Sequence, residues 1–261
     1  MEVDWGDGDY GRTAAALAPA ADALVDVAGI RAGDLVLDVG CGTGNASLAA
    51  AARGARVRAV DPSPGLVDLA RERATAAGAD VEAQVGDAGA LPFPDGAFDA
   101  VISSFAVIFA PDAEAAVREM VRVARPGGAV ALTSWLPGGG IAAAAEVLMS
   151  LLPPRPEPRP RWEDPAWIVG MLERAGAPGG TVVLREIAFT AASPEAWFDE
   201  HEAHHPVWRA LRREAGADAW RSVRERSVAA LAAHHDGGEG YRTTSGYAVI
   251  RSEREKPAAG A

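Results

Sequence analysis

Residues 36–45 read VLDVGCGTGN, which indicates a buried strand, a glycine turn and the start of a helix. The apolar run over 35–39 is typical of a parallel strand that is covered on both faces. The helix is expected over 45–53 and ends before Gly54. Such a turn places free backbone N–H groups at the carboxyl edge of the sheet, where open α/β sheets bind ligands. The stretch therefore predicts a ligand site at this edge.

The glycines of the turn have different expected roles. Gly40 and Gly42 stand where a side chain would block a ligand, and Gly44 is expected to let the helix pack against the strand. Their spacing is G-x-G-x-G, and Asn45 occupies the place of the third glycine of the dinucleotide fingerprint. This departure argues against a nicotinamide or flavin cofactor.

Strands and helices alternate on both sides of this stretch. Helices are predicted over 14–28, 64–77 and 113–124, and strands over 56–60, 81–85, 98–104 and 129–135. The alternation predicts a mostly parallel sheet with helices on both faces. After Pro137 the sequence predicts helices over 141–152, 164–175, 194–204, 206–215 and 217–234, strands over 181–189 and 241–251, and an extended proline-rich connector over 153–160.

Two further carboxylates follow predicted strands. Asp61 ends the second strand, where an acid accepts hydrogen bonds from both ribose hydroxyls of a nucleoside. Asp87 follows the third strand, where its carboxylate suits an exocyclic adenine amine. Taken singly, the glycine turn is compatible with an ordinary turn between a strand and a helix, and each aspartate with a helix cap. Together, at the ends of consecutive strands, they favour a nucleoside cofactor.

Composition restricts the class of protein. The 261 residues carry a formal net charge of −11, which repels a polyphosphate surface and argues against nucleic acid as a partner. The single cysteine, Cys41, allows no disulfide within the chain and fits a reducing compartment. The N-terminus lacks the apolar core of a signal peptide, and no apolar run has membrane-spanning length. We expect a cytoplasmic protein, monomeric or homodimeric, with no membrane partner.

At this point the sequence resembles the class I S-adenosylmethionine-dependent methyltransferases, most closely the type 11, ubiquinone-biosynthesis-like group. The matching pieces are VLDVGCGTGN at 36–45, AVDPSPGLVDLAR at 59–71, VGDAGALPFPDGAFDAVISSF at 85–105 and REMVRVARPGGAVAL at 118–132. The resemblance implies a Rossmann-like, doubly wound sheet of seven strands, mostly parallel, with one antiparallel strand near the edge. It covers about the first half of the chain and implies little about the acceptor.

The resemblance also implies a cofactor site for S-adenosyl-L-methionine. Gly40 and Gly42 would line its methionine portion, Asp61 its ribose, and Asp87, Ala88 and Leu66 its adenine. Ser104 and Phe105 would face the sulfonium and the substrate, and Tyr10 belongs to an N-terminal segment that folds over the cofactor. Asp38 either contacts the cofactor or supports the glycine turn. The full predicted cofactor set is Tyr10, Asp38, Gly40, Cys41, Gly42, Asp61, Pro62, Leu66, Asp87, Ala88, Ser104 and Phe105.

The expected domain organisation follows from this division. Residues 1–136 form the cofactor-binding core with an N-terminal helical cap, 137–252 complete the sheet and carry a helical lid, and 253–261 form a disordered tail. Five of the seven tryptophans lie between Trp162 and Trp220. They form either an aromatic pocket for a flat apolar acceptor or the core beneath the lid helices.

The histidines of the lid allow several interpretations. His201-Glu202-Ala203-His204-His205 matches the zinc-peptidase pattern H-E-x-x-H, but Pro206 disfavours helical geometry at His205, and no metal site is predicted. Trp197, His201, His204, Trp208 and Leu211 would share one helical face. His201 and His204 are therefore candidates for a general base, with hydrogen-bonded core histidines as the alternative.

We therefore expect a methyltransferase that acts on a small apolar or aromatic acceptor. The alternatives are a cofactor-binding protein of the same fold that does not transfer methyl, such as a cyclase, and a nicotinamide oxidoreductase.

Overall fold

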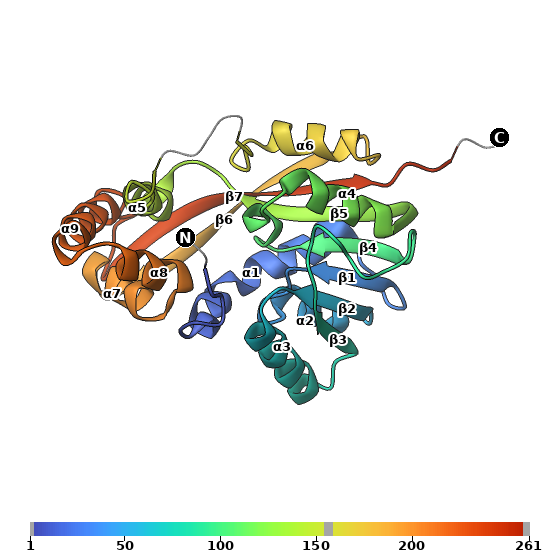
Figure 1. Cartoon of the computed structure of the whole chain (residues 1–261), viewed down its shortest axis with the longest axis horizontal. Coiled ribbons are helices and arrows are strands. Elements are labelled where there is room, and N and C mark those ends of the chain that lie inside the picture. Colours follow the sequence, from blue (N-terminus) through green and yellow to red (C-terminus); the bar gives the residue numbers. More distant parts are fainter. Residues whose placement is uncertain (1–2, 154–158, 258–261) are drawn as a thin grey trace. The chain divides into compact units, whose positions relative to one another are not determined.

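The computed structural model describes residues 3–153 and 159–257 (Figure 1). The chain forms two compact units. Unit 1 contains Met1–Ala16, Leu136–Arg159 and Arg185–Tyr247, and unit 2 contains Leu17–Trp135, Pro160–Leu184 and Ala248–Ala261. Residues 154–158 of the proline-rich connector lie outside the described residues, as do residues 258–261 of the expected tail.

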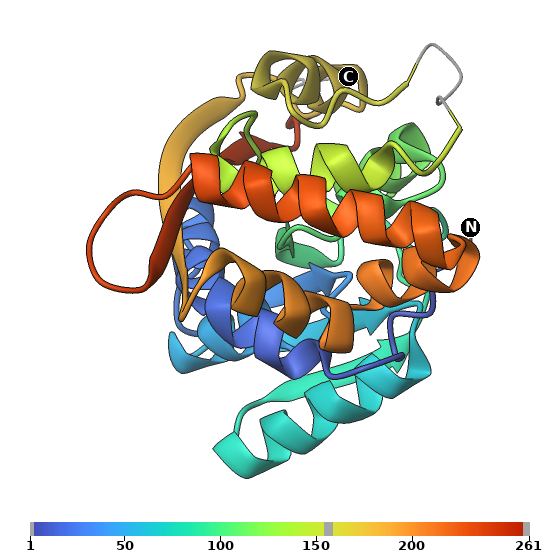
Figure 2. The ribbon, with the colours of Figure 1, turned by 90° about the vertical axis from the view of Figure 1, so that its left-hand side faces the viewer.

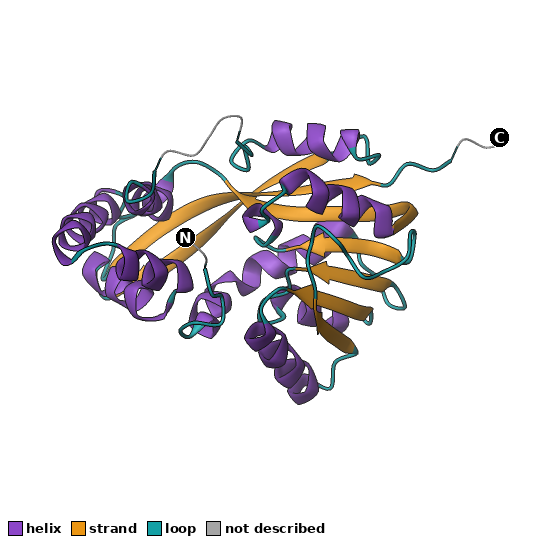
Figure 3. Cartoon of the chain, viewed as in Figure 1, coloured by secondary structure: helices purple, strands orange, loops and turns teal. Residues whose placement is uncertain are grey.

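Unit 2 contains a parallel sheet (Figure 3). Its strands are β1 (Leu35–Val39), β2 (Arg56–Asp61), β3 (Val81–Val85), β4 (Phe98–Ser103) and β5 (Ala124–Trp135), in the order β3-β2-β1-β4-β5. All four neighbouring pairs are parallel, with Val36 of β1 opposite Val57 on one side and Ala100 on the other. β1 and β4 are almost wholly buried, which explains their continuous apolar sequence.

Helices precede, connect and follow these strands. They are α1 (Tyr10–Ala28, which begins in unit 1), α2 (Asn45–Ala52), α3 (Pro64–Ala77), the 3-10 turn η1 (Val107–Phe109), α4 (Ala113–Val123) and α6 (Pro165–Arg174). Side-chain caps set two of the starts: Ser63 Oγ accepts from the Leu66 N–H, and Asp112 Oδ1 from the Ala115 N–H. Because parallel crossovers are right-handed, the reversal of strand order at β1 and β4 puts α4 on the opposite face from α2 and α3.

Two long strands complete the seven-stranded sheet, in the order β5-β7-β6: β6 (Thr181–Ala191) and β7 (Tyr241–Glu253). The Gly127 N–H donates to the Arg254 carbonyl and the Leu136 N–H to the Gly246 carbonyl. Residue numbers rise along β5 as they fall along β7, so β7 is antiparallel to β5. The prediction of one antiparallel strand near the edge is confirmed.

Besides the start of α1, the described part of unit 1 contains the helices α5 (Gly139–Met149), α7 (Pro194–His204), α8 (Pro206–Glu214) and α9 (Ala217–Ala233). α9 packs against α5 and α7 (Figure 2). Phe198, Leu148 and Leu231 are completely buried. None of the helices in the described part of the chain has the length and apolar character needed to cross a membrane.

The structure confirms most predicted elements but moves several bounds: α1 begins at Tyr10 instead of residue 14, and α5 spans Gly139–Met149 instead of 141–152. α3, β3 and α7 have the predicted bounds. The predicted start of β5 at residue 129 was wrong, because the strand begins at Ala124 and includes Pro126 and two glycines. Arg-Pro-Gly-Gly resembles a helix end in sequence. In the structure these residues already belong to the strand, and the Gly127 N–H donates to the Arg254 carbonyl.

Candidate functional site

The candidate site lies in unit 2, at the carboxyl edge of the sheet. The strand order reverses between β1 and β4, and this switch point is where open α/β sheets bind ligands. Five segments are available there: the loop Gly40–Gly44, the residues that follow β2, β3 and β4, and the end of β5.

Backbone hydrogen bonds, within the loop and to the end of β2, hold the glycine loop in place. Gly40, Gly42 and Gly44 all have positive φ (71°, 53° and 87°), which glycine adopts without strain. The N–H groups of Gly40 and Cys41 donate to the Val60 carbonyl, and that of Gly44 to the Cys41 carbonyl. The Gly42 N–H donates to Asp61 Oδ2 at 2.8 Å. The expectation of free N–H groups in this turn was therefore wrong for Gly40, Cys41, Gly42 and Gly44, because each of their N–H groups already has an acceptor within the protein.

Close packing requires a glycine at position 40 but leaves ordinary contact distance at position 44. A Cβ at Gly40 would lie 2.3 Å from Cβ of Ala106, which follows β4. A Cβ at Gly44 would lie 3.4 Å from Cβ of Ala70 in α3. α2, which begins after Gly44, contacts β1 and β2, and Gly44 itself also faces α3. Gly40 permits the approach of the β1 and β4 ends at the switch point.

Asp38 is a buried carboxylate beneath the loop. Its Oδ2 accepts from Ser47 Oγ of α2 at 2.6 Å, so Asp38 supports the start of that helix. Its Oδ1 is buried and has no hydrogen-bond partner within the described residues. Burial raises the pKa of Asp38 to about 6, against the lowering effect of the Ser47 hydrogen bonds. A buried carboxylate oxygen without a partner is costly unless a donor or a cation reaches it.

Asp61 joins the loop to the end of β2. Oδ2 accepts from the Gly42 N–H, and Oδ1 accepts from the Ser63 N–H at 2.9 Å. Burial raises the pKa of Asp61, while these two backbone hydrogen bonds oppose the shift. Each carboxylate oxygen has a second lone pair, so both retain capacity for a hydroxyl donor.

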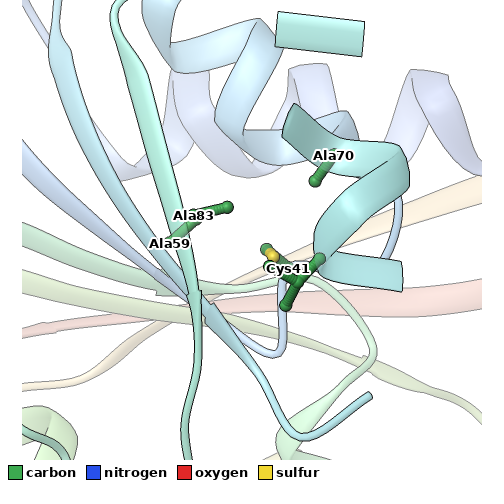
Figure 4. Close-up of a cluster of buried hydrophobic side chains, with 5 residues drawn as sticks. Cys41, Ala59, Ala70 and Ala83 are labelled. Atoms are coloured by element: carbon green, nitrogen blue, oxygen red, sulfur yellow. The ribbon is translucent and has the colours of Figure 1, made fainter. Parts of the chain in front are cut away.

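Cys41 directs its side chain away from a ligand and into the core. It packs against small apolar residues of β2, α3 and β3, namely Ala59, Val67, Ala70 and Ala83 (Figure 4). Burial raises the pKa of the Cys41 thiol well above its usual range, so the thiol stays protonated.

Arg73 of α3 is a loop contact that the sequence analysis missed. Its Nη1 donates to the Thr43 carbonyl at 2.6 Å, to Thr43 Oγ1 at 2.8 Å and to Asn45 Oδ1 at 3.0 Å. It thereby fixes the loop from the outside. The only sequence signal was an arginine in a helix that follows the loop, which does not specify this contact.

Phe105, after β4, has an unusual backbone. Its φ is +52°, a left-handed conformation that is rare outside glycine and often marks functional sites. Its N–H donates to Thr133 Oγ1 at 2.8 Å, and its ring stacks on Trp135 with centroids 4.1 Å apart. Ser103 Oγ donates to the Val39 carbonyl, which links the ends of β1 and β4.

The remaining predicted residues of unit 2 occupy the same edge. Leu66 is buried in the first turn of α3, whereas Pro62 is exposed. Asp87 is exposed, and its Oδ1 accepts from the Gly89 N–H at 2.8 Å in a tight turn. Ala88 and Ser104 are half-buried.

Unit 1 contains the other predicted residues. Tyr10 begins α1. α7 ends at His204, and His205 has an extended backbone, as Pro206 predicts, so the zinc-peptidase pattern lacks its continuous helix. The structure brings His201 together with His205, whose rings lie 6.0 Å apart. His204 is half-buried. Its carbonyl packs so closely against Gly8 that a side chain at position 8 would overlap with it.

Residues 37–132 match the family model described as a methyltransferase domain. The chain is 41% identical over 175 residues to the uncharacterized protein Rv1405c of Mycobacterium tuberculosis, which covers 64% of this chain and 63% of that protein. It is 41% identical over 115 residues to the demethylmenaquinone methyltransferase of Thermus thermophilus, covering 43% and 52%. The chain thus matches less than two thirds of the length of these relatives.

A solved structure supports the fold. The YcgJ protein of Bacillus subtilis superposes with a TM-score of 0.63 at 19% identity, covering 92% of this chain and all of that one. The matched domain contains the glycine loop, Asp38 and Asp61, and the resemblance drawn from the sequence is confirmed. Residues 37–132 of the chain therefore match the domain of S-adenosylmethionine-dependent methyltransferases.

Proposed function

We propose that this protein transfers the methyl group of S-adenosyl-L-methionine to a small apolar or aromatic acceptor. The observation that carries the proposal is the buried Asp38, whose Oδ1 has no partner beside the glycine loop. S-adenosylmethionine carries an ammonium group and a sulfonium, and a cation is the partner that a buried carboxylate requires. The residues present therefore fit this cofactor.

The proposed contacts follow the strand ends. Asp38 holds the cationic methionine portion, and Asp61 accepts from the ribose hydroxyls with its remaining lone pairs. Leu66, Asp87 and Ala88 surround the adenine, with Pro62 at the rim. Gly40, Gly42 and the Cys41 backbone supply the surface on which the methionine portion lies. Ser104 and Phe105 face the reacting centre, and Tyr10 belongs to the segment that covers the cofactor.

The cofactor supplies a methyl group that is already activated by the sulfonium. The protein then has to align the acceptor and exclude water. His201 and His204 are the proposed candidates for a base. Burial lowers the pKa of His201 to about 4, so at neutral pH its imidazole is uncharged and suited to accept a hydrogen bond. An amine or an acidic phenol would need no stronger base.

Three features support a small aromatic acceptor. The net charge of −11 disfavours nucleic acid, and the relative from Thermus thermophilus is named for demethylmenaquinone. Trp197 and Trp208 of unit 1 are buried among histidine rings and provide apolar surface.

The test is incubation of the purified protein with S-adenosylmethionine and a panel of naphthols, quinols and aromatic amines, followed by mass spectrometry. We expect one acceptor to gain a single methyl group together with an equal amount of S-adenosylhomocysteine. Consumption of a compound without S-adenosylhomocysteine would instead support a cyclase-type catalyst of the same fold. Tight binding of the cofactor with no chemistry on any compound would support a binding module.

A further inference from the structure

A cluster of four rings lies at the α7–α8 turn of unit 1. It consists of Trp197, His201, His205 and Trp208, which we call the Trp–His cluster. The His201 ring stacks on Trp197 with centroids 3.6 Å apart and lies 5.8 Å from the Trp208 ring at a tilt of 54°. Trp208 also meets His205 edge-on at 4.9 Å. Two tryptophans and two imidazoles thus form one compact aromatic surface.

The tautomer of His201 follows from its hydrogen bond. Nδ1 lies 2.8 Å from the Trp197 carbonyl oxygen, which only accepts, so Nδ1 carries the proton. Burial lowers the pKa of His201, so the ring is neutral at pH 7. Nε2 therefore presents a lone pair, and no described residue donates a hydrogen bond to it. His201 is half-buried, so part of its side chain remains accessible.

Trp208 provides the opposite hydrogen-bonding group. Its side chain is only 6% exposed, and its Nε1–H is buried with no hydrogen-bond partner among the described residues. Buried indole N–H groups usually find a partner, and an unsatisfied one calls for a missing ligand or water. By contrast, Nε1 of Trp220 in the same unit donates to Glu202 Oε1 at 3.0 Å.

The nearby carboxylates are already engaged. Glu202 accepts from Trp220 and forms an ion pair with Arg212 at 2.7 Å, and Glu200 pairs with Arg12 at 2.8 Å. The cluster itself therefore offers one neutral acceptor, one neutral donor and aromatic faces. This set suits an uncharged planar molecule with a hydroxyl group.

We propose that the Trp–His cluster binds the hydroxyl-bearing edge of a planar aromatic ligand, with His201 Nε2 accepting from the hydroxyl and Trp208 Nε1–H donating to an oxygen of the same molecule. The ligand class is a neutral phenol or enol. The identification of this ligand as the methyl acceptor rests on the proposed function, whereas the binding site does not. His205 replaces His204 as the second histidine of the site, because the chain turns at Pro206.

The experiment uses the full chain with 15N-labelled tryptophan, without S-adenosylmethionine. The indole N–H signals of the protein are recorded in 1H–15N NMR spectra while 2-naphthol is added. The Trp208 signal is assigned as the one that is lost in Trp208→Phe. We expect the Trp208 signal to shift with saturation and the signals of Trp162 and Trp167 in unit 2 to stay in place. 2-Methoxynaphthalene, which has the same rings but no hydroxyl proton, should bind about tenfold more weakly, as expected for one lost hydrogen bond.

Variants connect the signal to the proposed groups. His201→Phe keeps the stacking on Trp197 but removes the acceptor, so it should abolish the preference for 2-naphthol over its methyl ether. Trp162→Phe is the matched control and should keep both the shift and the preference. A Trp208 signal that does not move, or a preference that survives in His201→Phe, would overturn the site and assign the unpaired N–H to water. Because no cofactor is present, neither result depends on methyl transfer.

Discussion

The Asp38 carboxylate is fully buried, with its pKa raised from 3.8 to about 6 by desolvation. The folded state binds the proton more tightly than the unfolded state, so the stability that Asp38 contributes is present below pH 4 and lost as the pH rises towards 6. The loss corresponds to about 3 kcal/mol. Asp38→Asn should remove this slope, which urea denaturation of both proteins between pH 4 and 7 would measure.

The same substitution separates stability from binding. At pH 7 Asp38→Asn should be as stable as the natural protein or more stable, yet bind S-adenosylmethionine about 10- to 100-fold more weakly, the range of a charge-assisted hydrogen bond. Calorimetric titration gives the affinity. An unchanged affinity would remove Asp38 from the cofactor site.

Gly40 allows a second test with an internal control. Gly33→Ala has positive φ (88°) but no atom within 4 Å of the new Cβ, so it should cost only the conformational strain, about 1 kcal/mol. Gly40→Ala adds the overlap with Ala106 and should cost about 1–3 kcal/mol more. Equal unfolding midpoints in urea for the two variants would show that the residues after β4 move aside at no cost in stability.

Sequence predicted which residues gather at this edge, but it did not predict how their bonds are distributed. The apolar run before Asp61 predicts that this residue ends a strand. Its hydrogen bond to the Gly42 N–H, however, depends on the path of the folded loop. The unpaired Oδ1 of Asp38 likewise depends on which groups reach it in three dimensions. Periodicity contains neither piece of information.

Among the elements, α3 controls the glycine loop through Arg73. Arg73→Met should leave the helix folded and weaken S-adenosylmethionine binding about tenfold, because the loop loses its outer anchor. Arg71→Met, on the same helix, removes bonds to Asp68 and to the Ala83 carbonyl but leaves the loop contact intact. Comparable affinities for the two variants would show that the loop keeps its shape without Arg73.

Local signals fixed most element bounds. Ser63 followed by Pro64 begins α3, and Gly78 ends it in the left-handed conformation. β5 could not be bounded in this way, because Gly127 and Gly128 near its start pair with Arg254, which directly follows β7 and is more than a hundred positions away. His205 was set aside as a candidate base because Pro206 disfavours helical geometry there. The structure confirms the extended backbone of His205, but its ring still lies 6.0 Å from the ring of His201.

For the whole molecule, cofactor binding should stabilise unit 2 through mass action. A ligand at a hundredfold excess over its Kd adds about 2.7 kcal/mol to the free energy of unfolding, or about 5–10 °C for a chain of this size. S-adenosylhomocysteine should raise the melting temperature in a saturable way. NADH should leave it unchanged, because the third glycine of the dinucleotide fingerprint is Asn45.

Hydrogen exchange would locate that stabilisation. The N–H groups of Gly40, Gly42 and Ser63 are already bonded to Val60 and Asp61 at the end of β2. They exchange only when this region opens, and a bound S-adenosylhomocysteine should slow them. The buried face of α9 provides a reference in unit 1. Slower exchange in the loop but not in α9 is the expected result. Equal slowing in both would indicate a general effect on the chain, and slowing in α9 alone would place the nucleoside away from the glycine loop.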